Sequence, residues 1–599
     1  MSEPRDEYAS RLAERRGGAA RLSARQARIS NARLAVFALG AAGVLLIWGA
    51  HWLPPLALAP PALLFLALVV WHDRVIAARE QADRAVAFYE RGLERLDGTW
   101  HGRGSSGEEF LDPHHPYAAD LDIFGSGSMF ELLCTARTAS GEMHLAEWLS
   151  RPASPEEVRK RQAGVAELRP RLDLREELAL LGEDLRLGIH PKQLAEWGAR
   201  EPLHGAREWR MIVAGLGTFT LLALFAWLAR YLGFASPGPY PFVIALFLGG
   251  LTALHLRGRV RGILASAEAP LRELALLARF LERLDQERFE CERLATLRQA
   301  LSSAGAPAWR EVLRLERLLV WADARRNQLF APFAAILLWG LQFSLAVEVW
   351  RQRCGLELPR WLAAVGEIEA LVALASHAYE NPEDPFPELV EAGPEFDGEG
   401  LGHPLLPTDR IVRNDVRLDA EHAVYVVSGS NMSGKSTWLR TVGANTVLAL
   451  AGATVRARRL RVSTLALGAS IRVHDSLQEG ESRFYAEIKR LRQIVELAGD
   501  EIQLLFLLDE ILHGTNSHDR RIGAAAVVRD LVRRGAVGLV TTHDLALARI
   551  ADELAPRAAN VHFEDHLEDG RIAFDYRLRA GVVEKSNALA LMREVGLDV

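Results

Sequence analysis

The sequence predicts an α/β domain of the phosphate-binding-loop type, C-terminal to a mainly α-helical region that carries two transmembrane helical hairpins. Three observations predict this fold class. Apolar residues gather in two pairs of uncharged runs. The segment between these pairs has mainly helical patterning, and leucine alternates with Arg and Glu at helical spacing after the second pair. A glycine-rich loop then follows an apolar strand pattern near residue 424. At 599 residues the chain is also too long for one hydrophobic core.

The composition limits the class of protein. Lys+Arg 71 against Asp+Glu 77 gives a formal charge of -6, so the chain as a whole is not a basic nucleic-acid binder, although a local basic face remains compatible with it. Hydrophobic residues make up 49%, which is high beside 25% charged residues and requires that the apolar excess be concentrated. Cys134, Cys291 and Cys354 lie far apart, which fits a reducing compartment and argues against a disulfide scaffold or a zinc site.

The apolar excess lies in two predicted hairpins. Residues Leu34 to Leu53 carry no charge, and after Pro54 and Pro55 a second run extends from Leu56 to Trp71. A second pair covers Met211 to Leu228 and Pro241 to Leu256. Each run is close to the roughly 20 residues that cross a bilayer, and the short connections predict helical hairpins. The alternative is that these runs are buried core helices of a soluble protein.

Arginines flank both hairpins on the side of the long segments. Eight of them precede the first hairpin, between Arg5 and Arg33, whereas the connecting turns contain only Arg230. The positive-inside rule therefore predicts a multi-pass protein of a bacterial-type inner (plasma) membrane, with the C-terminal domain in the cytoplasm. A fifth apolar run, Phe330 to Val347, contains Gln342 and is followed by Glu348, so we expect a core helix there.

The most specific motif begins at the strand Val424 to Val427 and continues into a helix through Leu450. Its residues follow the pattern G-x-x-x-x-G-K-[ST] and are Gly429, Ser430, Asn431, Met432, Ser433, Gly434, Lys435, Ser436 and Thr437. Such a loop surrounds phosphate with backbone N–H groups at a helix N-terminus. Lys435 is predicted to reach the β- and γ-phosphates of ATP, and the Ser436 hydroxyl to ligate Mg²⁺.

Two further strands predict catalytic side chains. The apolar strand Leu504 to Leu508 ends in Asp509 and Glu510, and a run that is apolar on both faces is typical of the centre of a parallel sheet. We expect Asp509 to hold the Mg²⁺ water shell and Glu510 to orient or deprotonate the attacking water. The strand Val537 to Thr541 precedes His543, which we expect to contact the γ-phosphate.

These motifs resemble those of the MutS mismatch-repair family. The Asn431-Met432 pair, the stretch from Asp509 to Asp519, and Thr541 to His543 are similar to the family's loop, carboxylate strand and switch histidine. The resemblance implies a MutS/ABC-type P-loop ATPase domain that uses ATP and Mg²⁺. The segment Asp475 to Phe484 resembles the stretch that crosses the family's dimer, which implies a catalytic role for Ser482 in the partner's site. Arg483 replaces the family's next residue, a threonine.

A weaker resemblance to the start of the MutS core (lever) domain covers Asp120 to Leu149 and Arg161 to Ala163. The stretches Glu367 to Ala375 and Gly402 to Leu406 resemble the junction between the family's core and ATPase domains. No counterpart of the mismatch-reading domain is found. The tripeptide at Phe88 imitates the family's Phe-x-Glu wedge, but it lacks the flanking Gly-Asp and follows a hairpin, so we interpret it as structural. The resemblance therefore implies a membrane-anchored branch of the family.

The expected function is that of a membrane-anchored ATPase acting as a dimeric conformational switch, with a homodimer formed through the ATPase domains and an unknown protein partner. One alternative is a membrane-tethered DNA-binding protein of the repair or recombination type, which would bind DNA without mismatch specificity. A basic patch would favour it, and the densest arginine cluster of the C-terminal domain is Arg456, Arg458, Arg459 and Arg461. The other alternative is a transporter-associated ATPase.

The predicted organisation has six parts. They are a basic cytoplasmic arm (1–33), hairpin 1 (34–75), a helical MutS-core-like segment (76–205), hairpin 2 (206–257), a helical lever or core segment (258–400) and the ATPase domain (401–599).

Overall fold

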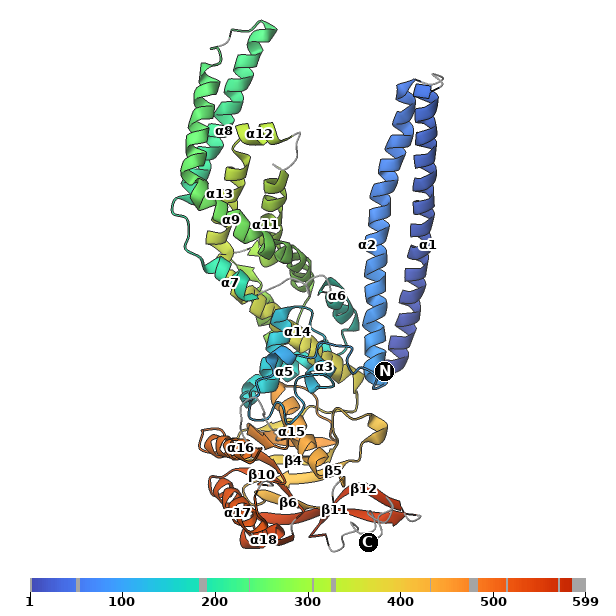
Figure 1. The fold of residues 1–599 in the computed structure, drawn as a ribbon, viewed down its shortest axis with the longest axis vertical. Coiled ribbons are helices and arrows are strands. Elements are labelled where there is room, and N and C mark those ends of the chain that lie inside the picture. The colour runs from blue at the N-terminus through green and yellow to red at the C-terminus, as the bar shows by residue number, and fades with distance from the viewer. Residues whose placement is uncertain are drawn as a thin grey trace.

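The structure is a computed structural model, and it describes residues 3–49, 54–182, 191–235, 237–303, 306–324, 330–430, 432–472, 483–512, 515–543, 545–568 and 571–583. The molecule is elongated, with the strands of the α/β domain at one end and two long helical hairpins that extend toward the other (Figure 1). Helices of the middle region join the two ends, and most of them pack around the long helix α14 (Leu358–Glu380).

Hairpin 1 consists of α1 (Pro4–Val44), which continues as a π-helical turn to Gly49, and α2 (Ala59–Leu96). Both helices run without interruption from the apolar tip into the charged lower half, so the expected boundaries at residues 33 and 75 fall inside continuous helices. At the base, Tyr8 and Phe88 pack with Tyr89 and Tyr379 in a small buried cluster. Phe88 is therefore a core residue, as the sequence context indicates.

The middle region holds short helices that surround α14. Buried leucine and alanine side chains on nearly every turn of α14 account for its central position, because a helix that is apolar all round is stable only when covered on all sides. The helices of this region are α3 (Met129–Leu133), α4 (Ala139–Ser150), α5 (Pro155–Leu168), α6 (Leu172–Gly182), α7 (Pro191–Ala199) and α10 (Glu292–Ala300). A two-stranded ribbon, β1 (Ser302–Ser303) with β2 (Ala306–Pro307), follows α10.

Hairpin 2 consists of α8 (Ala206–Leu228) and α9 (Tyr240–Gln286), and α9 extends well beyond the apolar run. Against it pack α11 (Ala308–Asp323), α12 (Ala331–Ile336) and α13 (Trp339–Cys354). The expectation of one core helix over Phe330 to Val347 is wrong in part. Leu338 adopts a left-handed conformation with φ 50° and separates α12 from α13. Before Ser344, Ala334 is the one buried residue of this stretch.

Five helical stretches of the described residues are long and apolar enough to cross a membrane. Four of them belong to the hairpins, and within their apolar windows between 6% and 22% of the residues are buried. The fifth spans Trp339–Glu380, and 89% of its window is buried. Burial therefore separates α13 and α14, which form the core, from the two hairpins, whose apolar side chains face outward.

The α/β domain contains two sheets. The six-stranded sheet has the order β12-β11-β6-β10-β9-β8 and is parallel except for β12. Its strands are β6 (Val424–Ser428), β8 (Ala466–Ser470), β9 (Leu504–Asp509), β10 (Val537–Thr542), β11 (Ala558–Glu568) and β12 (Arg571–Ala580). The second sheet, in the order β3-β7-β4-β5, comprises β3 (Glu388–Val390), β7 (Arg459–Ser463), β4 (Phe396–Leu401) and β5 (Asn414–Leu418).

Three helices accompany the larger sheet, α15 (Lys435–Ala451), α16 (Arg483–Leu497) and α17 (Ser517–Arg533), and α18 (Leu545–Glu553) follows β10. The Leu504 to Leu508 strand is an interior parallel strand as expected, since β9 pairs in parallel with β10 on one side and β8 on the other, although it lies next to the edge strand rather than at the centre. Because β6, β10 and β9 are parallel neighbours, the residues that follow them gather at one edge of the sheet.

Candidate active site

The glycine-rich loop connects β6 to α15, as the motif requires. Gly434 occupies the N-cap of α15 with φ 101°, a conformation that residues with a Cβ rarely adopt. A Cβ at this position would also come within 3.0 Å of the Tyr576 ring. Glycine at 434 therefore allows the turn that starts α15 directly after the loop. The first N–H groups of α15 then face the loop, where they can bind an anion.

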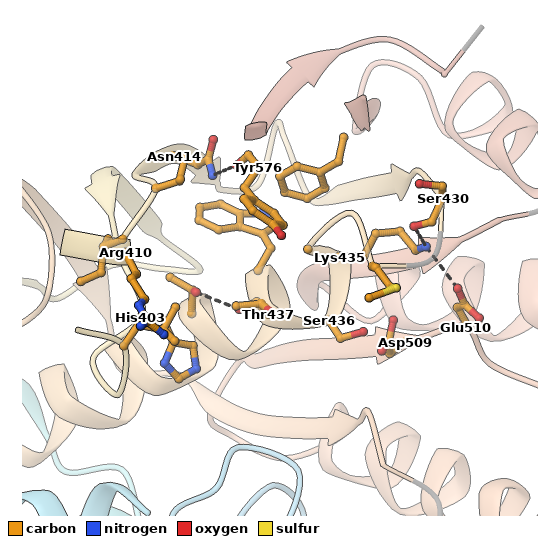
Figure 2. Close-up of a pocket in the computed structure, with 18 residues that line it drawn as sticks. His403, Arg410, Asn414, Ser430, Lys435, Ser436, Thr437, Asp509, Glu510 and Tyr576 are labelled. Carbon is orange, nitrogen blue, oxygen red and sulfur yellow. Dashed lines mark hydrogen bonds and ion pairs between the residues drawn. The ribbon is translucent and has the colours of Figure 1, made fainter. Parts of the chain in front are cut away.

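Lys435 lies across the loop and is almost fully buried. Its Nζ donates hydrogen bonds to the carbonyl oxygens of Gly429 at 2.8 Å and Ser430 at 3.0 Å. The same ammonium forms an ion pair with Glu510 at 3.3 Å, which Figure 2 marks with a dashed line. A buried ammonium is stable only when its donors are satisfied, and these three oxygens supply the partners. The cation is thus fixed at the mouth of the loop.

The carboxylates at the end of β9 are positioned by β10. The Thr541 hydroxyl donates to Asp509 Oδ1 and accepts the backbone N–H of Glu510 at 3.0 Å. Thr541 is completely buried, so its side chain has one fixed set of partners. Figure 2 shows Asp509 beside Ser436, the first hydroxyl of α15. The two residues expected to serve Mg²⁺ are therefore neighbours, although they come from distant parts of the sequence.

Glu510 connects the loop to the histidine after β10. One of its oxygens pairs with Lys435, and the other lies 3.3 Å from Nδ1 of His543. The Glu510 backbone has φ 47°, which is unusual for a residue with a side chain and is held in place by the hydrogen bond to Thr541. The structure thus brings together Lys435, Asp509, Glu510 and His543, which the sequence places in three separate motifs.

Lys435, Asp509 and Glu510 line one end of a cavity of about 780 Å³. The other end is formed by His403, Leu406, Asn414, Phe563 and Tyr576. Asn414 fixes this end, because its Nδ2 donates to the Tyr576 carbonyl at 2.9 Å and its Oδ1 accepts from the Leu578 N–H at 2.8 Å (Figure 2). A polar end and a partly aromatic end in one cavity suit a nucleotide, whose phosphates and base differ in the same way.

Sequence reasoning missed Asn414, Phe563 and Tyr576 as pocket residues, and it did not anticipate the double hydrogen bond of Thr541. Asn414 and Tyr576 are 162 positions apart, so no local spacing links them. His403 was noted only for its resemblance to the core junction. Burial lowers the pKa of His403 to about 4, so its imidazole is neutral near pH 7.

The donor set fits ATP and Mg²⁺. Ser430 and Ser433 of the loop each have a buried hydroxyl oxygen without a hydrogen-bond partner among the described residues, and such atoms call for a ligand or water. Within the described part of the chain, no group of three or more His, Cys, Asp or Glu side chains could hold a metal. A hydroxyl and one carboxylate are what a magnesium site completed by phosphates and water requires.

Two of the expected site residues, Asn431 and Ser482, lie outside the described residues. The other loop residues lie where the motif predicts. Met432 has φ 70° and is exposed, and the side chains of Ser436 and Thr437 line the cavity.

A phosphate-binding loop between a parallel strand and a helix, with an Asp-Glu pair at the end of a nearby strand, defines a P-loop ATPase-type domain. Residues 425–598 match the family model described as MutS domain V, so the C-terminal domain is similar to that domain. This match covers the loop, the carboxylate strand and the histidine.

Curated relatives extend the similarity upstream of this domain. The chain is 33% identical over 310 residues to "DNA mismatch repair protein MutS 2" of Halobacterium salinarum, which covers 50% of this chain and 33% of the relative. It is 31% identical over 255 residues to "DNA mismatch repair protein MutS" of Brevibacillus brevis (41% and 29%) and 30% identical over 250 residues to "Endonuclease MutS2" of Thermus thermophilus (40% and 31%). The chain thus spans about a third or less of the length of these relatives. Together, the matches show that this chain is similar to MutS-family proteins over its C-terminal domain and part of the region before it.

Proposed function

We propose that this chain is a membrane-anchored MutS-type ATPase that binds and hydrolyses ATP as a dimeric conformational switch. The observation that carries the proposal is that the α/β domain, which holds the nucleotide-type cavity, and the tips of the two hairpins lie at opposite ends of the molecule. Figure 1 shows this arrangement of the ribbon, and the apolar side chains of the hairpins are largely exposed. The ATPase domain is cytoplasmic in this proposal, and the hairpins cross a bacterial-type inner membrane. Dimer formation through the ATPase domains follows from the family resemblance.

The geometry suggests a separate role for each site residue. ATP with Mg²⁺ supplies the transferable phosphoryl group and the charge that polarises it. Lys435 neutralises phosphate charge at the loop, and Ser436 with Asp509 holds the metal and its water. Glu510, turned toward the loop by Thr541, orients the attacking water and accepts its proton. His543 contacts Glu510 and senses the occupancy of the site.

Membrane anchoring is supported by the surface of the hairpins. Side chains such as Leu45 (71% exposed), Trp48 (60%) and Phe247 (66%) would face water along a whole segment if the protein were soluble. Monomeric soluble proteins rarely expose apolar patches of this extent. Both apolar tips also lie at the same end of the long axis, so one bilayer could receive them together (Figure 1).

A chain of buried polar contacts leads from the nucleotide loop toward hairpin 1. On α15, Asn445 accepts the backbone N–H of Arg456 at 2.8 Å. The Arg456 guanidinium donates to Asn381 at 2.7 Å and lies 3.2 Å from Asp384. Burial raises the pKa of Asp384 to about 6, against the opposing effect of Arg456. Because Asn381 directly follows α14, these contacts tie the loop helix to the end of the central helix.

The contacts continue into the hairpin. Glu380, the last residue of α14, accepts from Arg95 Nε on α2 at 2.8 Å and from the Tyr8 hydroxyl on α1 at 3.3 Å. Both helices of hairpin 1 therefore hold one buried carboxylate. Loss of Arg95 would leave its charge without the opposite charge, and loss of Tyr8 would remove one of its hydrogen bonds. We infer that a movement of α15 on nucleotide binding is transmitted to α1 and α2 through these side chains.

The DNA-binding alternative rests on the names of the relatives. Two features could have favoured DNA binding, the arginine cluster and the wedge-like Phe88, but the side chains of both make contacts within the protein. Arg458 pairs with Asp415, Arg459 with Glu399, and Arg461 with Glu395, so the expected basic cluster is balanced by carboxylates. Phe88, the wedge-like residue, is buried beside Tyr89. The transporter alternative has no supporting contact among the described residues.

Single-cysteine labelling tests the membrane topology. In a variant without Cys134, Cys291 and Cys354, a cysteine at Leu56 or Phe234 should react with an impermeant maleimide added to intact cells, because both sites lie at hairpin tips. A cysteine at Glu109 should react only after lysis, because the basic flanks keep the middle region inside. Labelling of Glu109→Cys in intact cells would contradict the proposed orientation.

A further inference from the structure

A small apolar unit, here called the aromatic shelf, stands beside hairpin 2. It comprises Val320 and Trp321 at the end of α11 together with residues 330–343, which include α12 and the first turn of α13. No charged residue occurs between Phe330 and Val347. Trp321 (53% exposed) and Phe333 (52%) face outward, and α12 lies crosswise to the long helices at the level of hairpin 2 (Figure 1). Neither the nucleotide site nor the hairpins account for this surface.

Two close contacts show where along the helices of hairpin 2 the aromatic shelf lies. A Cβ on Gly217 of α8 would lie 2.8 Å from the Leu337 carbonyl oxygen, and one on Gly249 of α9 would lie 3.5 Å from the Leu338 side chain. Gly217 is seven residues above Arg210, and Gly249 is eight residues above Arg257, the charged ends of the two apolar runs. At 1.5 Å per residue, both place the shelf about 10–12 Å beyond those charges.

Two backbone carbonyl groups of the shelf accept hydrogen bonds from side chains of the shelf itself, which suits contact with lipid. The helix break at Leu338 frees the Leu337 carbonyl, which accepts from Gln342 Nε2 at 2.7 Å. Trp339 Nε1 donates to the Trp321 carbonyl near the end of α11 at 2.5 Å. An unsatisfied backbone group in hydrocarbon costs several kcal/mol, so these contacts make an irregular segment tolerable there. The hydrogen bond to the Leu337 carbonyl also explains why a polar residue, Gln342, occurs within the apolar run.

The aromatic side chains favour the boundary of the bilayer over its centre. Trp321 and Trp339 stack with ring centroids 5.7 Å apart, and Phe330 and Phe343 pack against Trp339 at 5.1 Å and 4.7 Å. Tryptophan concentrates where headgroups meet acyl chains, because its ring is apolar and its N–H is polar. The carboxylate of Asp323, exposed at the end of α11, is also compatible with the headgroup boundary, whereas it would be costly at the centre of the hydrocarbon core.

We propose that the aromatic shelf inserts into the headgroup–acyl boundary of the lipid bilayer and forms a third membrane contact that does not span it. This inference rests on the membrane anchoring proposed above. The occupant of the exposed face is lipid, because the shelf shares the level and the outward apolar side chains of hairpin 2, and because residues 330–343 carry no charge. Since α11 and α13 lead directly into the middle region, the contact also fixes the height of that region above the membrane.

Depth-dependent quenching tests the shelf on the full-length protein in phosphatidylcholine vesicles. A polarity-sensitive fluorophore is attached to Phe333→Cys, to Leu222→Cys within hairpin 2, or to Met143→Cys in the middle region, each in the cysteine-free variant. Nitroxide lipids carry the spin label near the headgroup or deep in the acyl chain. We expect shallow nitroxide to quench Phe333→Cys about twofold more than deep nitroxide, the reverse order for Leu222→Cys, and no quenching of Met143→Cys.

The outcomes separate this inference from the proposed function. Quenching of Leu222→Cys without quenching of Phe333→Cys would overturn the shelf and leave the anchoring intact, and this is also the result if a second copy or another protein covers α12. Stronger quenching of Phe333→Cys by deep nitroxide would overturn the boundary position. The absence of quenching at both sites would refute the membrane anchoring. Because Phe333 is exposed, its replacement does not open the core.

Discussion

Lys435→Ala should abolish ATP binding at physiological concentrations. The ammonium is the buried cation of the loop, and its removal takes away charge-assisted hydrogen bonds to phosphate. Two such bonds at about 1.5 kcal/mol each lower affinity on the order of a hundredfold. The change also leaves Glu510, its partner at 3.3 Å, facing incoming phosphates without a compensating charge. Titration with a fluorescent ATP analogue measures the dissociation constant directly.

The matched control is Lys160→Ala, which removes an exposed lysine whose ion pair in the described part of the chain is with its helix neighbour Glu156. It should bind ATP as the parent protein does. Circular dichroism establishes whether the Lys435 variant is folded. A folded Lys435→Ala protein with parental affinity would show that this cavity is not the ATP site.

Glu510→Gln should bind ATP normally but hydrolyse it about 10²–10⁴-fold more slowly, the usual size of a general-base effect. Glutamine keeps the size of the side chain and one oxygen toward Lys435, while it cannot accept the proton of water at neutral pH. The Glu510 N–H bond to Thr541 is a backbone contact and survives the change. Steady-state phosphate release and ATP titration on the same sample separate the two effects.

Glu421→Gln, in the exposed turn before β6, serves as the control and should leave turnover unchanged. An equal loss of binding in the Glu510 and Lys435 variants would be incompatible with the separate roles assigned to them. Full turnover in Glu510→Gln would move the base to another residue, and His543, at 3.3 Å from Glu510, would then be the first to replace.

Features that depend on local sequence were predicted correctly. The glycine-rich loop, the carboxylate strand and the helical hairpins each occupy a continuous stretch whose residue types dictate its structure. The loop begins at Gly429 and leads into a helix at Lys435, and Leu504 to Leu508 form a buried parallel strand, as expected. The chemistry of such segments is encoded within about ten neighbouring residues.

Features that depend on contacts between distant residues were not predictable. The pairing of Tyr8 with Glu380 joins residues 372 positions apart, and nothing near either residue indicates it. The break at Leu338 was missed because the residues around it are all apolar, so hydropathy continues across it while the backbone does not. Leucine seldom adopts a positive φ, and here the packing of α12 against hairpin 2 and the Gln342 hydrogen bond hold it.

The central claim is that nucleotide bound at one end of the molecule changes the arrangement of the hairpins at the other. Leu39 in α1 and Phe247 in α9 are both exposed, so each can be replaced by a spin-labelled cysteine. Double electron–electron resonance in lipid nanodiscs then measures the distance between the two hairpins. In the Glu510→Gln background, Mg²⁺-ATP should shift the distance distribution, and the shift should be absent in Lys435→Ala. An unchanged distribution in Glu510→Gln protein that has bound ATP would contradict the proposed switch.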